Sequence, residues 1–142
     1  MESLKGILMG REMFFVEEHQ VVSDVARKMA ELHVGAILVL RNGALQGIFS
    51  ERDLMTRVVV DGRNIHETAV GDVMTRHPST IPESASVATA MEMMHEHGCR
   101  HLPVLGPDRV VGMVSMRDLM NYELERKTQE IEHMRAYIHG AA

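Results

Sequence analysis

A serine, an arginine and an aspartate occur twice in this chain at the same spacing. Residues 47–55 read GIFSERDLM, and residues 112–120 read GMVSMRDLM. A serine hydroxyl can donate a hydrogen bond to a phosphate oxygen, and an arginine guanidinium can hold a phosphate through two bonds at once. An aspartate carboxylate can accept hydrogen bonds from the two hydroxyls of a ribose. The two stretches therefore indicate a nucleotide as the candidate ligand.

The position of these residues in the chain supports that interpretation and also offers a simpler one. Each stretch lies where an apolar strand ends and a helix begins, so Ser50 and Ser115 are predicted helix caps. A helix N-terminus has free N–H groups and the positive end of a dipole, which attract phosphate. Ser-x-x-Asp is also close to a capping box, in which the two side chains only satisfy the backbone. Capping alone requires neither the arginine nor the preceding glycine, and both recur.

An internal repeat positions both stretches. When the chain is shifted against itself by 65 residues, ten of the 27 positions from Met29 to Met55 are identical to those from Met94 to Met120. Self-similarity at a fixed period is typical of a protein built from copies of one structural unit. One such unit cannot cover its own sheet, but two units packed together can.

Each copy predicts the order helix, strand, strand, helix. Apolar residues at i, i+3 and i+7 mark one face of the first helix; they are Val22, Val25 and Met29, and then Val87, Ala90 and Met94. Ser23 and Ser86 are the predicted caps of these two helices. The predicted helices are 22–33, 53–60, 87–97 and 118–138, and the predicted strands are 34–40, 44–50, 99–105 and 109–115. The first strand pair is joined by Asn-Gly, a hairpin signal.

The composition argues against several classes of protein. The 142 residues carry a formal net charge of -5, whereas a general nucleic-acid binder needs a basic surface for the phosphates. The single cysteine, Cys99, cannot form an intrachain disulfide. The longest apolar run, residues 34–40, is too short to cross a bilayer, and the N-terminus has no secretory pattern. We therefore expect a cytoplasmic protein that contacts neither nucleic acid nor membrane.

Several motifs together resemble a tandem pair of cystathionine-β-synthase (CBS) domains, a Bateman module. They are the 65-residue repeat, AVGDVMT between the halves, RHLPVL in the second half, and GIFSERD and GMVSMRD closing each sheet. The resemblance covers about residues 8–125. It implies an α/β (α+β) fold of two helix–strand–strand–helix repeats, packed sheet to sheet about a pseudo-twofold axis. The expected division is repeat 1 at 8–62, an inter-repeat segment at 63–78, repeat 2 at 79–125 and a C-terminal helix extension at 126–142.

The resemblance also implies a function. CBS pairs commonly bind adenosine-containing ligands in clefts between the repeats, here AMP, ADP, ATP, NAD or S-adenosylmethionine. Such a ligand is regulatory, so we expect no required cofactor, no metal and no catalysis. The family often forms flat homodimers through helices like those at 22–33, 53–60, 87–97 and 118–138, and we expect that dimer. The module could also contact an unknown protein target.

By the same resemblance, each of two clefts combines the turn of one repeat with the first strand of the other. Asp118 would hold the ribose and Ser115 the phosphate in cleft A. The residues of cleft A are Phe14, Val34, Gly35, Ala36, Met113, Ser115, Arg117 and Asp118. The residues of cleft B are Ile48, Ser50, Arg52, Asp53, Ser79, Thr80, Cys99, Arg100 and His101. Cleft B is the more polar, because Arg100 and His101 correspond to Gly35 and Ala36 in the first repeat.

Three alternatives to nucleotide binding stay open. The cluster His95, His97, Cys99 and His101 could suggest a transition-metal site, although the two helical histidines point about 200° apart and do not converge. A stand-alone enzyme lacks support, because neither serine has the second glycine of a nucleophile elbow and no glycine-rich phosphate loop is present. A dimerisation scaffold that binds nothing would not require two intact turns.

The last helix is predicted to continue to about Ile138. An intermittent apolar stripe runs along it, formed by Met120, Leu124, Ile131, Met134 and Ile138. The stripe either packs on the helix's own domain or contacts a second subunit, and amphipathicity alone does not decide between these.

Overall fold

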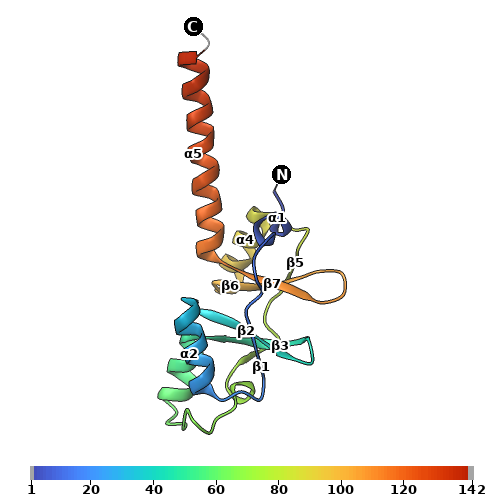
Figure 1. Cartoon of the computed structure of the whole chain (residues 1–142), viewed down its shortest axis with the longest axis vertical. Coiled ribbons are helices and arrows are strands. Elements are labelled where there is room, and N and C mark those ends of the chain that lie inside the picture. Colours follow the sequence, from blue (N-terminus) through green and yellow to red (C-terminus); the bar gives the residue numbers. More distant parts are fainter. Residues whose placement is uncertain (1, 141–142) are drawn as a thin grey trace.

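Two α/β repeats lie one above the other along the long axis of the molecule, as the computed structural model of residues 2–140 shows (Figure 1). The first repeat contains β1 (Phe15–Glu17), α2 (Val22–Leu32), β2 (Ala36–Arg41), β3 (Ala44–Ser50), α3 (Glu51–Asp53) and the π-helix η1 (Leu54–Val59). The second contains β5 (Ile81–Pro82), α4 (Val87–His97), β6 (His101–Leu105), β7 (Val110–Ser115) and α5 (Met116–Gly140). Short segments precede each repeat: α1 (Leu4–Leu8) before the first, and the 3-10 turn η2 (Val70–Asp72) with β4 (Thr75–Arg76) before the second. The predicted order of helix, strand, strand and helix is confirmed in both copies.

The strands form two sheets, with the orders β1-β2-β3-β4 and β5-β6-β7. In each, an antiparallel hairpin is extended by a short parallel strand, β1 or β5. The first hairpin turns at Asn42 and Gly43, whose φ angles of 51° and 82° suit the predicted Asn-Gly turn. Both hairpins shift register at the equivalent place, between Val39 and Leu40 and again after Val104. The two repeats therefore share even this irregularity in strand pairing.

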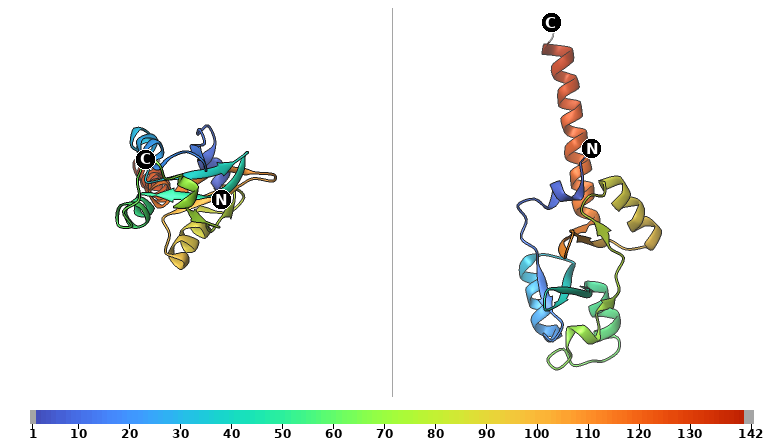
Figure 2. Two further views of the ribbon diagram at one scale, coloured as in Figure 1. Left: turned by 90° about the horizontal axis from the view of Figure 1, so that it is seen from below. Right: turned by 90° about the vertical axis from the view of Figure 1, so that its right-hand side faces the viewer.

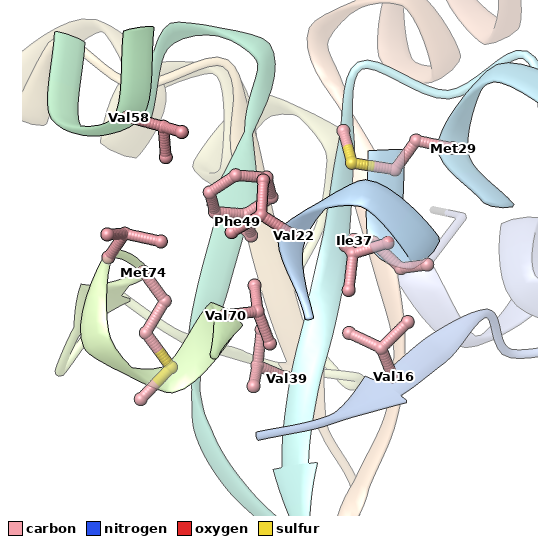
Figure 3. Packing of buried hydrophobic residues seen from close by; sticks show 11 residues of the cluster. Val16, Val22, Met29, Ile37, Val39, Phe49, Val58, Val70 and Met74 are labelled. Atoms are coloured by element: carbon pink, nitrogen blue, oxygen red, sulfur yellow. The ribbon is translucent and has the colours of Figure 1, made fainter. Parts of the chain in front are cut away.

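Each repeat has an apolar core of its own. Figure 3 shows the first, in which Val22 and Met29 of α2 lie over the strand residues Ile37 and Phe49. The predicted helical faces are confirmed in both repeats, because all six of their residues are buried, namely Val22, Val25, Met29, Val87, Ala90 and Met94. Burying one aliphatic side chain of this size contributes about 1.5–3 kcal/mol, so these faces are what hold the helices to the sheets.

A third apolar cluster joins the two sheets. Leu38 and Leu40 of β2 are buried together with Val110 of β7. Successive strand residues point to opposite faces of a sheet, so Val39 packs into its own core while its two neighbours pack against the other repeat. The repeats therefore pack sheet to sheet, as the resemblance implied.

The segments in front of the repeats are exchanged between them. α1 precedes the first repeat but packs on the second, where Leu4 is fully buried and its N–H donates to the Ala85 carbonyl. η2 precedes the second repeat but packs on the first, where Val70 is fully buried and its N–H donates to the Gln20 carbonyl. Neither core is complete without the segment that precedes the other repeat, so the exchange holds the two repeats together.

This exchange explains the glycine that precedes each Ser-x-Arg-Asp turn. β4 runs so close to Gly47 that a Cβ there would overlap the Thr75 carbonyl oxygen. α1 lies over Gly112, where a Cβ would come within 3.2 Å of the Leu8 side chain. The glycine therefore recurs for a packing reason, which the sequence interpretation had not included.

The start of α2 differs from the prediction. Ser23 does not cap this helix, because the N–H groups of Val22 and Ser23 donate to the carbonyls of Thr68 and Ile65 in the inter-repeat segment. That segment supplies the acceptors that a capping side chain otherwise provides. The prediction for Ser23 was wrong, whereas Ser86 is confirmed, since its side chain accepts from the Thr89 N–H.

The helix α5 extends well beyond the sheets (Figure 1 and the right-hand view of Figure 2). Leu119, near its start, is buried in the second core, but every residue from Leu124 to Gly140 is exposed. This finding excludes the interpretation in which the distal stripe packs on its own domain. Over the described residues, no helix has both the length and the apolar character required to span a lipid bilayer.

Candidate functional site

The first Ser-x-Arg-Asp turn is closed by contacts within the protein. Ser50 and Asp53 form the capping box: the Ser50 N–H donates to Asp53 Oδ2 (3.0 Å), and the Asp53 N–H donates to Ser50 Oγ (3.1 Å). The Thr75 hydroxyl lies 3.1 and 3.2 Å from the two carboxylate oxygens of Asp53, to which it donates. Arg57 Nε lies 3.8 Å from Oδ1. Only 9% of the Asp53 side chain is exposed, so its acceptor sites are occupied by the protein itself.

The second turn has the same backbone geometry and a more accessible carboxylate. The Ser115 N–H donates to Asp118 Oδ2 (2.8 Å), and the Asp118 N–H donates to Ser115 Oγ (3.1 Å). The other carboxylate oxygen, Oδ1, pairs with Arg11 Nη1 at 3.3 Å. The Asp118 side chain is 26% exposed and that of Arg11 is 45% exposed. A ligand hydroxyl can therefore reach Asp118 if Arg11 moves, whereas Asp53 is covered.

The arginines of the two turns lie on the outside. Arg52 and Arg117 are both exposed, and neither side chain forms an ion pair or hydrogen bond with any other residue in the range 2–140. Arg100, which precedes β6, is also exposed. These guanidinium groups are therefore accessible from solvent.

Gly35 and Arg100, which precede β2 and β6, accept hydrogen bonds from the first N–H groups of α3 and α5 and do not pair within the sheets. The Gly35 carbonyl accepts the Glu51 N–H at 3.0 Å, and the Arg100 carbonyl accepts the Met116 N–H at 2.8 Å. Both strands therefore begin two residues later than predicted. Each strand start also lies beside the turn of its own repeat, since Ala36 pairs with Ser50 and His101 with Ser115.

His101 lies where the two repeats meet. A Cβ built on Gly35 would be 3.8 Å from His101 Cε1 and 3.7 Å from the Glu51 carboxylate. Burial lowers the pKa of His101 from its usual 6.5; the carboxylates of Asp118 and Glu51 oppose this shift, and Arg100 adds to it. The sequence interpretation grouped His101 with the first turn, and the structure surrounds it with Asp118 of the second turn and the residue that follows Ser50.

The other predicted residues lie nearer the cores. Phe14 and Val34 pack against the first core, and Cys99 packs against the second. Ile48 and Met113 pack against the cluster between the sheets, where they face the junction of the repeats. Buried Ala36 and half-buried Ser79 and Thr80 complete the predicted set. The assignment of all these residues to two ligand clefts stays a prediction.

Sequence reasoning missed the three residues that decide how accessible each carboxylate is: Arg11, Arg57 and Thr75. Extending the repeat toward the N-terminus would have found part of this set, because the 65-residue shift aligns Arg11 with Arg76 and Gly10 with Thr75. It could not have shown that the segment before one repeat reaches the turn of the other.

Two shallow surface hollows include none of the serine, arginine or aspartate residues of the turns. One, of about 200 Å³, is lined by Lys5, Leu8, Met9, Glu83 and Val111. The other, of about 230 Å³, is lined by Met91, Met120, Glu123, Leu124 and Lys127. Neither gathers the polar groups of a nucleotide site, so the chemistry of the turns is the better guide to ligand binding.

The histidine and cysteine side chains at 95–101 do not come together as a group of three or more. Nowhere in residues 2–140 do three or more His, Cys, Asp or Glu side chains come together in a way that could hold a metal ion. His95 and His97 are exposed on α4, while Cys99 and His101 lie beyond its end. The metal alternative therefore has no geometric support.

These features define a class of protein: a tandem-repeat α/β module with two equivalent polar turns near the junction of its repeats. The chain belongs to the CBS domain family, whose family model matches residues 4–60 and 70–125. A relative from Arabidopsis thaliana, the CBS domain-containing protein CBSX3, mitochondrial, is 35% identical over 124 residues. The match covers 84% of this chain but only 60% of that protein's length.

Solved structures share the fold. A protein with CBS domains from Burkholderia ambifaria MC40-6 has a TM-score of 0.82 and 32% sequence identity, covering 87% of this chain and 95% of the other. The CBS domain protein PAE2072 from Pyrobaculum aerophilum, complexed with AMP, has a TM-score of 0.74 and 23% identity, covering 82% of this chain and 89% of that one. At that level of identity, the second likeness shows the fold alone.

Proposed function

We propose that this chain is a regulatory module that binds an adenosine-containing ligand at the second Ser-x-Arg-Asp turn, beside the junction of the repeats. The observation that carries the proposal is the partly exposed carboxylate of Asp118, which follows in the chain an exposed Arg117 that forms no ion pair within residues 2–140. The AMP complex of PAE2072, a protein of the same fold, supports an adenine nucleotide as the ligand class. ADP, ATP and NAD present the same adenosine phosphate, and S-adenosylmethionine presents the same adenine and ribose hydroxyls without a phosphate.

In the proposed site, each group has one role. Asp118 accepts from the ribose hydroxyls, the Ser115 hydroxyl donates to phosphate, and Arg117 neutralises the phosphate charge. Gly35 leaves room beside His101, and the neighbouring backbone frames the adenine. The first turn is the weaker candidate, since a ribose at Asp53 would have to displace the Thr75 hydroxyl.

Arg11 connects the proposed site to both repeats. It occupies the carboxylate oxygen that a ribose would need, so ligand binding must displace it. Arg11 lies between α1, which packs on the second repeat, and β1, which belongs to the first. A ligand regulates only by binding one arrangement of the repeats more tightly than another. Because the segment that contains Arg11 connects the two repeats, displacing Arg11 can change how they are arranged.

Isothermal titration calorimetry with AMP tests the proposal. Asp118→Ala should weaken AMP binding about tenfold, because a charged hydrogen bond to the ribose is lost. Asp108→Ala, which removes an exposed aspartate in the β6–β7 loop, is the matched control and should bind as the wild type does. Equal AMP affinities for the two variants would refute the assignment of Asp118. Mass spectrometry of small molecules released from the purified protein would identify the natural ligand.

A ligand-independent dimerisation scaffold is the second candidate function. Met55 and Val59 of η1 are 55% and 66% exposed, and the equivalent residues of α5, Met120 and Leu124, are 52% and 63% exposed. Exposed apolar side chains at equivalent places on both repeats favour a homodimer through the surface helices. Melting temperatures measured with AMP, ATP, NAD and S-adenosylmethionine distinguish the two functions. A ligand that binds only the folded state raises the melting temperature. No rise with any of the four would favour the scaffold.

A further inference from the structure

The distal part of α5 is an unpartnered helix outside the family-matched region. The family match ends at residue 125, while α5 continues to Gly140. Residues 124–140 are exposed on every side, and Figure 1 shows this part of the helix projecting away from both sheets. A helix that contacts only water is normally polar all round, and this one is not.

Its exposed apolar residues follow a heptad repeat. Met120, Leu124, Ile131, Met134 and Ile138 are each between 52% and 65% exposed. Their steps of four, seven, three and four residues place them at alternating d and a positions, with Lys127 at the d position between Leu124 and Ile131. We name the stripe formed by these six residues the α5 seam. A repeat of 3.5 residues is the spacing at which two helices keep one face in contact along their length.

We propose that the α5 seam pairs in parallel with the α5 seam of a second copy of this chain, forming a short two-stranded coiled coil. The a positions are Leu124, Ile131 and Ile138, and the d positions are Met120, Lys127 and Met134. β-branched residues at a positions are typical of parallel two-stranded coiled coils, and Ile131 and Ile138 supply two of the three a positions. This proposal is independent of nucleotide binding.

The charges beside the seam fit a parallel pair. Glu130 occupies a g position and Arg135 the following e position. In a parallel coiled coil, each Glu130 faces Arg135 of the second copy, which is an attractive contact. In an antiparallel pair of full overlap, g positions face each other, so Glu130 would meet the Glu130 of the second copy and repel it. Lys127 weakens the seam but lies one turn from both Glu123 and Glu130, which neutralise part of its charge.

The seam continues onto the body of the domain. The hollow of about 230 Å³ at the base of α5 is lined by Met120 and Leu124 of the seam and by Met91 of α4. Since α5 runs along the long axis, parallel pairing sets the second repeats side by side and brings the first repeats toward each other (Figure 1). In the left-hand view of Figure 2, α2 and η1 lie on the same side of the axis as α5, so like helices of the two copies can also meet.

Ile131→Asp tests the seam by sedimentation equilibrium of the full chain. A charge buried at an a position should raise the dimer dissociation constant by more than about tenfold. Gln129→Asp, which introduces the same charge on the opposite face of α5, is the matched control and should leave dimerisation unchanged. Because Ile131 is outside every core cluster of its own chain, the melting temperature of the monomer should not fall. Identical dissociation constants for the two variants, or a wild type that stays monomeric, would overturn the proposal.

Two further variants test the register and the direction. Lys127→Leu should tighten the dimer by about tenfold, because an apolar residue replaces a charge in the seam. Met134→Cys should form an intermolecular disulfide on mild oxidation, since d positions face each other across a parallel pair. Gln129→Cys should not, and the wild type, with Cys99 alone, gives the background. Cross-linking at Gln129→Cys as strong as at Met134→Cys, or a weaker dimer in Lys127→Leu, would contradict the parallel seam.

Discussion

The two Ser-x-Arg-Asp turns have the same capping box but differ in what surrounds the aspartate. The segment that crosses the first turn supplies Thr75 to Asp53, whereas the equivalent residue at the second turn is Gly10, which has no hydroxyl. Arg57 lies beside Asp53, while its counterpart, Tyr122, carries no positive charge. Apart from its capping box, the Asp118 carboxylate has one contact among the described residues, the exposed ion pair with Arg11.

The same motif therefore has two different surroundings in one chain. At the first turn, the carboxylate is satisfied by neighbouring residues, so its role is to stabilise the fold. At the second turn, the same carboxylate is partly exposed, which the proposed ligand site requires. The surroundings of the motif, and not the motif itself, separate the two roles.

Replacing each aspartate by alanine should give the largest difference between the two turns. Asp53→Ala should lower the free energy of unfolding by about 3 kcal/mol, because it leaves the Thr75 hydroxyl and the Ser50 N–H without their acceptor and removes the ion pair with Arg57. Asp118→Ala should lower it by only about 1 kcal/mol, since water can reach the groups it leaves. Urea denaturation measures both. Equal losses would show that the two turns do not differ as described.

The glycines in front of the turns should differ next most. Gly47→Ala should lower the free energy of unfolding by about 2 kcal/mol, because the new methyl group overlaps the backbone of β4. Gly112→Ala should cost less than about 1 kcal/mol, since its neighbour is the Leu8 side chain, which can rotate away. Urea denaturation measures the free energy of unfolding of both variants. A larger loss for Gly112→Ala than for Gly47→Ala would contradict the prediction.

Arg11→Ala should have opposite effects on stability and on affinity. Its ion pair with Asp118 is exposed, so the free energy of unfolding should fall by no more than about 0.5 kcal/mol. AMP should bind a few times more tightly, because the competitor for Asp118 is gone. Arg41→Ala, which removes another exposed ion pair, is the control for the stability effect. Weaker AMP binding in Arg11→Ala would show that Arg11 contacts the ligand.

The smallest effect is expected from pH, and only on the side of the second turn. Burial lowers the pKa of His101 in the folded protein, so the unfolded chain binds the proton more readily. The stability tied to neutral His101 is fully present above about pH 6.5 and is lost as the pH falls below that value. His101→Gln should lose less stability between pH 7 and pH 5 than the wild type. The control, His97→Gln at the exposed end of α4, should behave as the wild type does.

Much of the fold could be predicted because its signals are local. The second strand was expected at 44–50 and is β3 (Ala44–Ser50), and the helix expected at 87–97 is α4 (Val87–His97). The predictions were wrong where a distant segment supplies a hydrogen-bond partner that a local residue was expected to supply. Ser23 lost its capping role to the Ile65 and Thr68 carbonyls, and β2 starts late because the Gly35 carbonyl binds a helix start.

The two repeats, the buried faces of α2 and α4 and the capping boxes are all predictable from the amino-acid sequence. The repeats follow from matching residues 65 positions apart, while the faces and the capping boxes depend on residues within a few positions of each other, where spacing alone decides which side chains meet. The accessibility of each carboxylate, and the choice of repeat that each preceding segment completes, depend on long-range packing instead. Thr75 reaches Asp53 across the inter-repeat segment, and Arg11 reaches Asp118 from the opposite end of the chain. Contacts at that separation depend on how the sheets pack, and no local spacing encodes them.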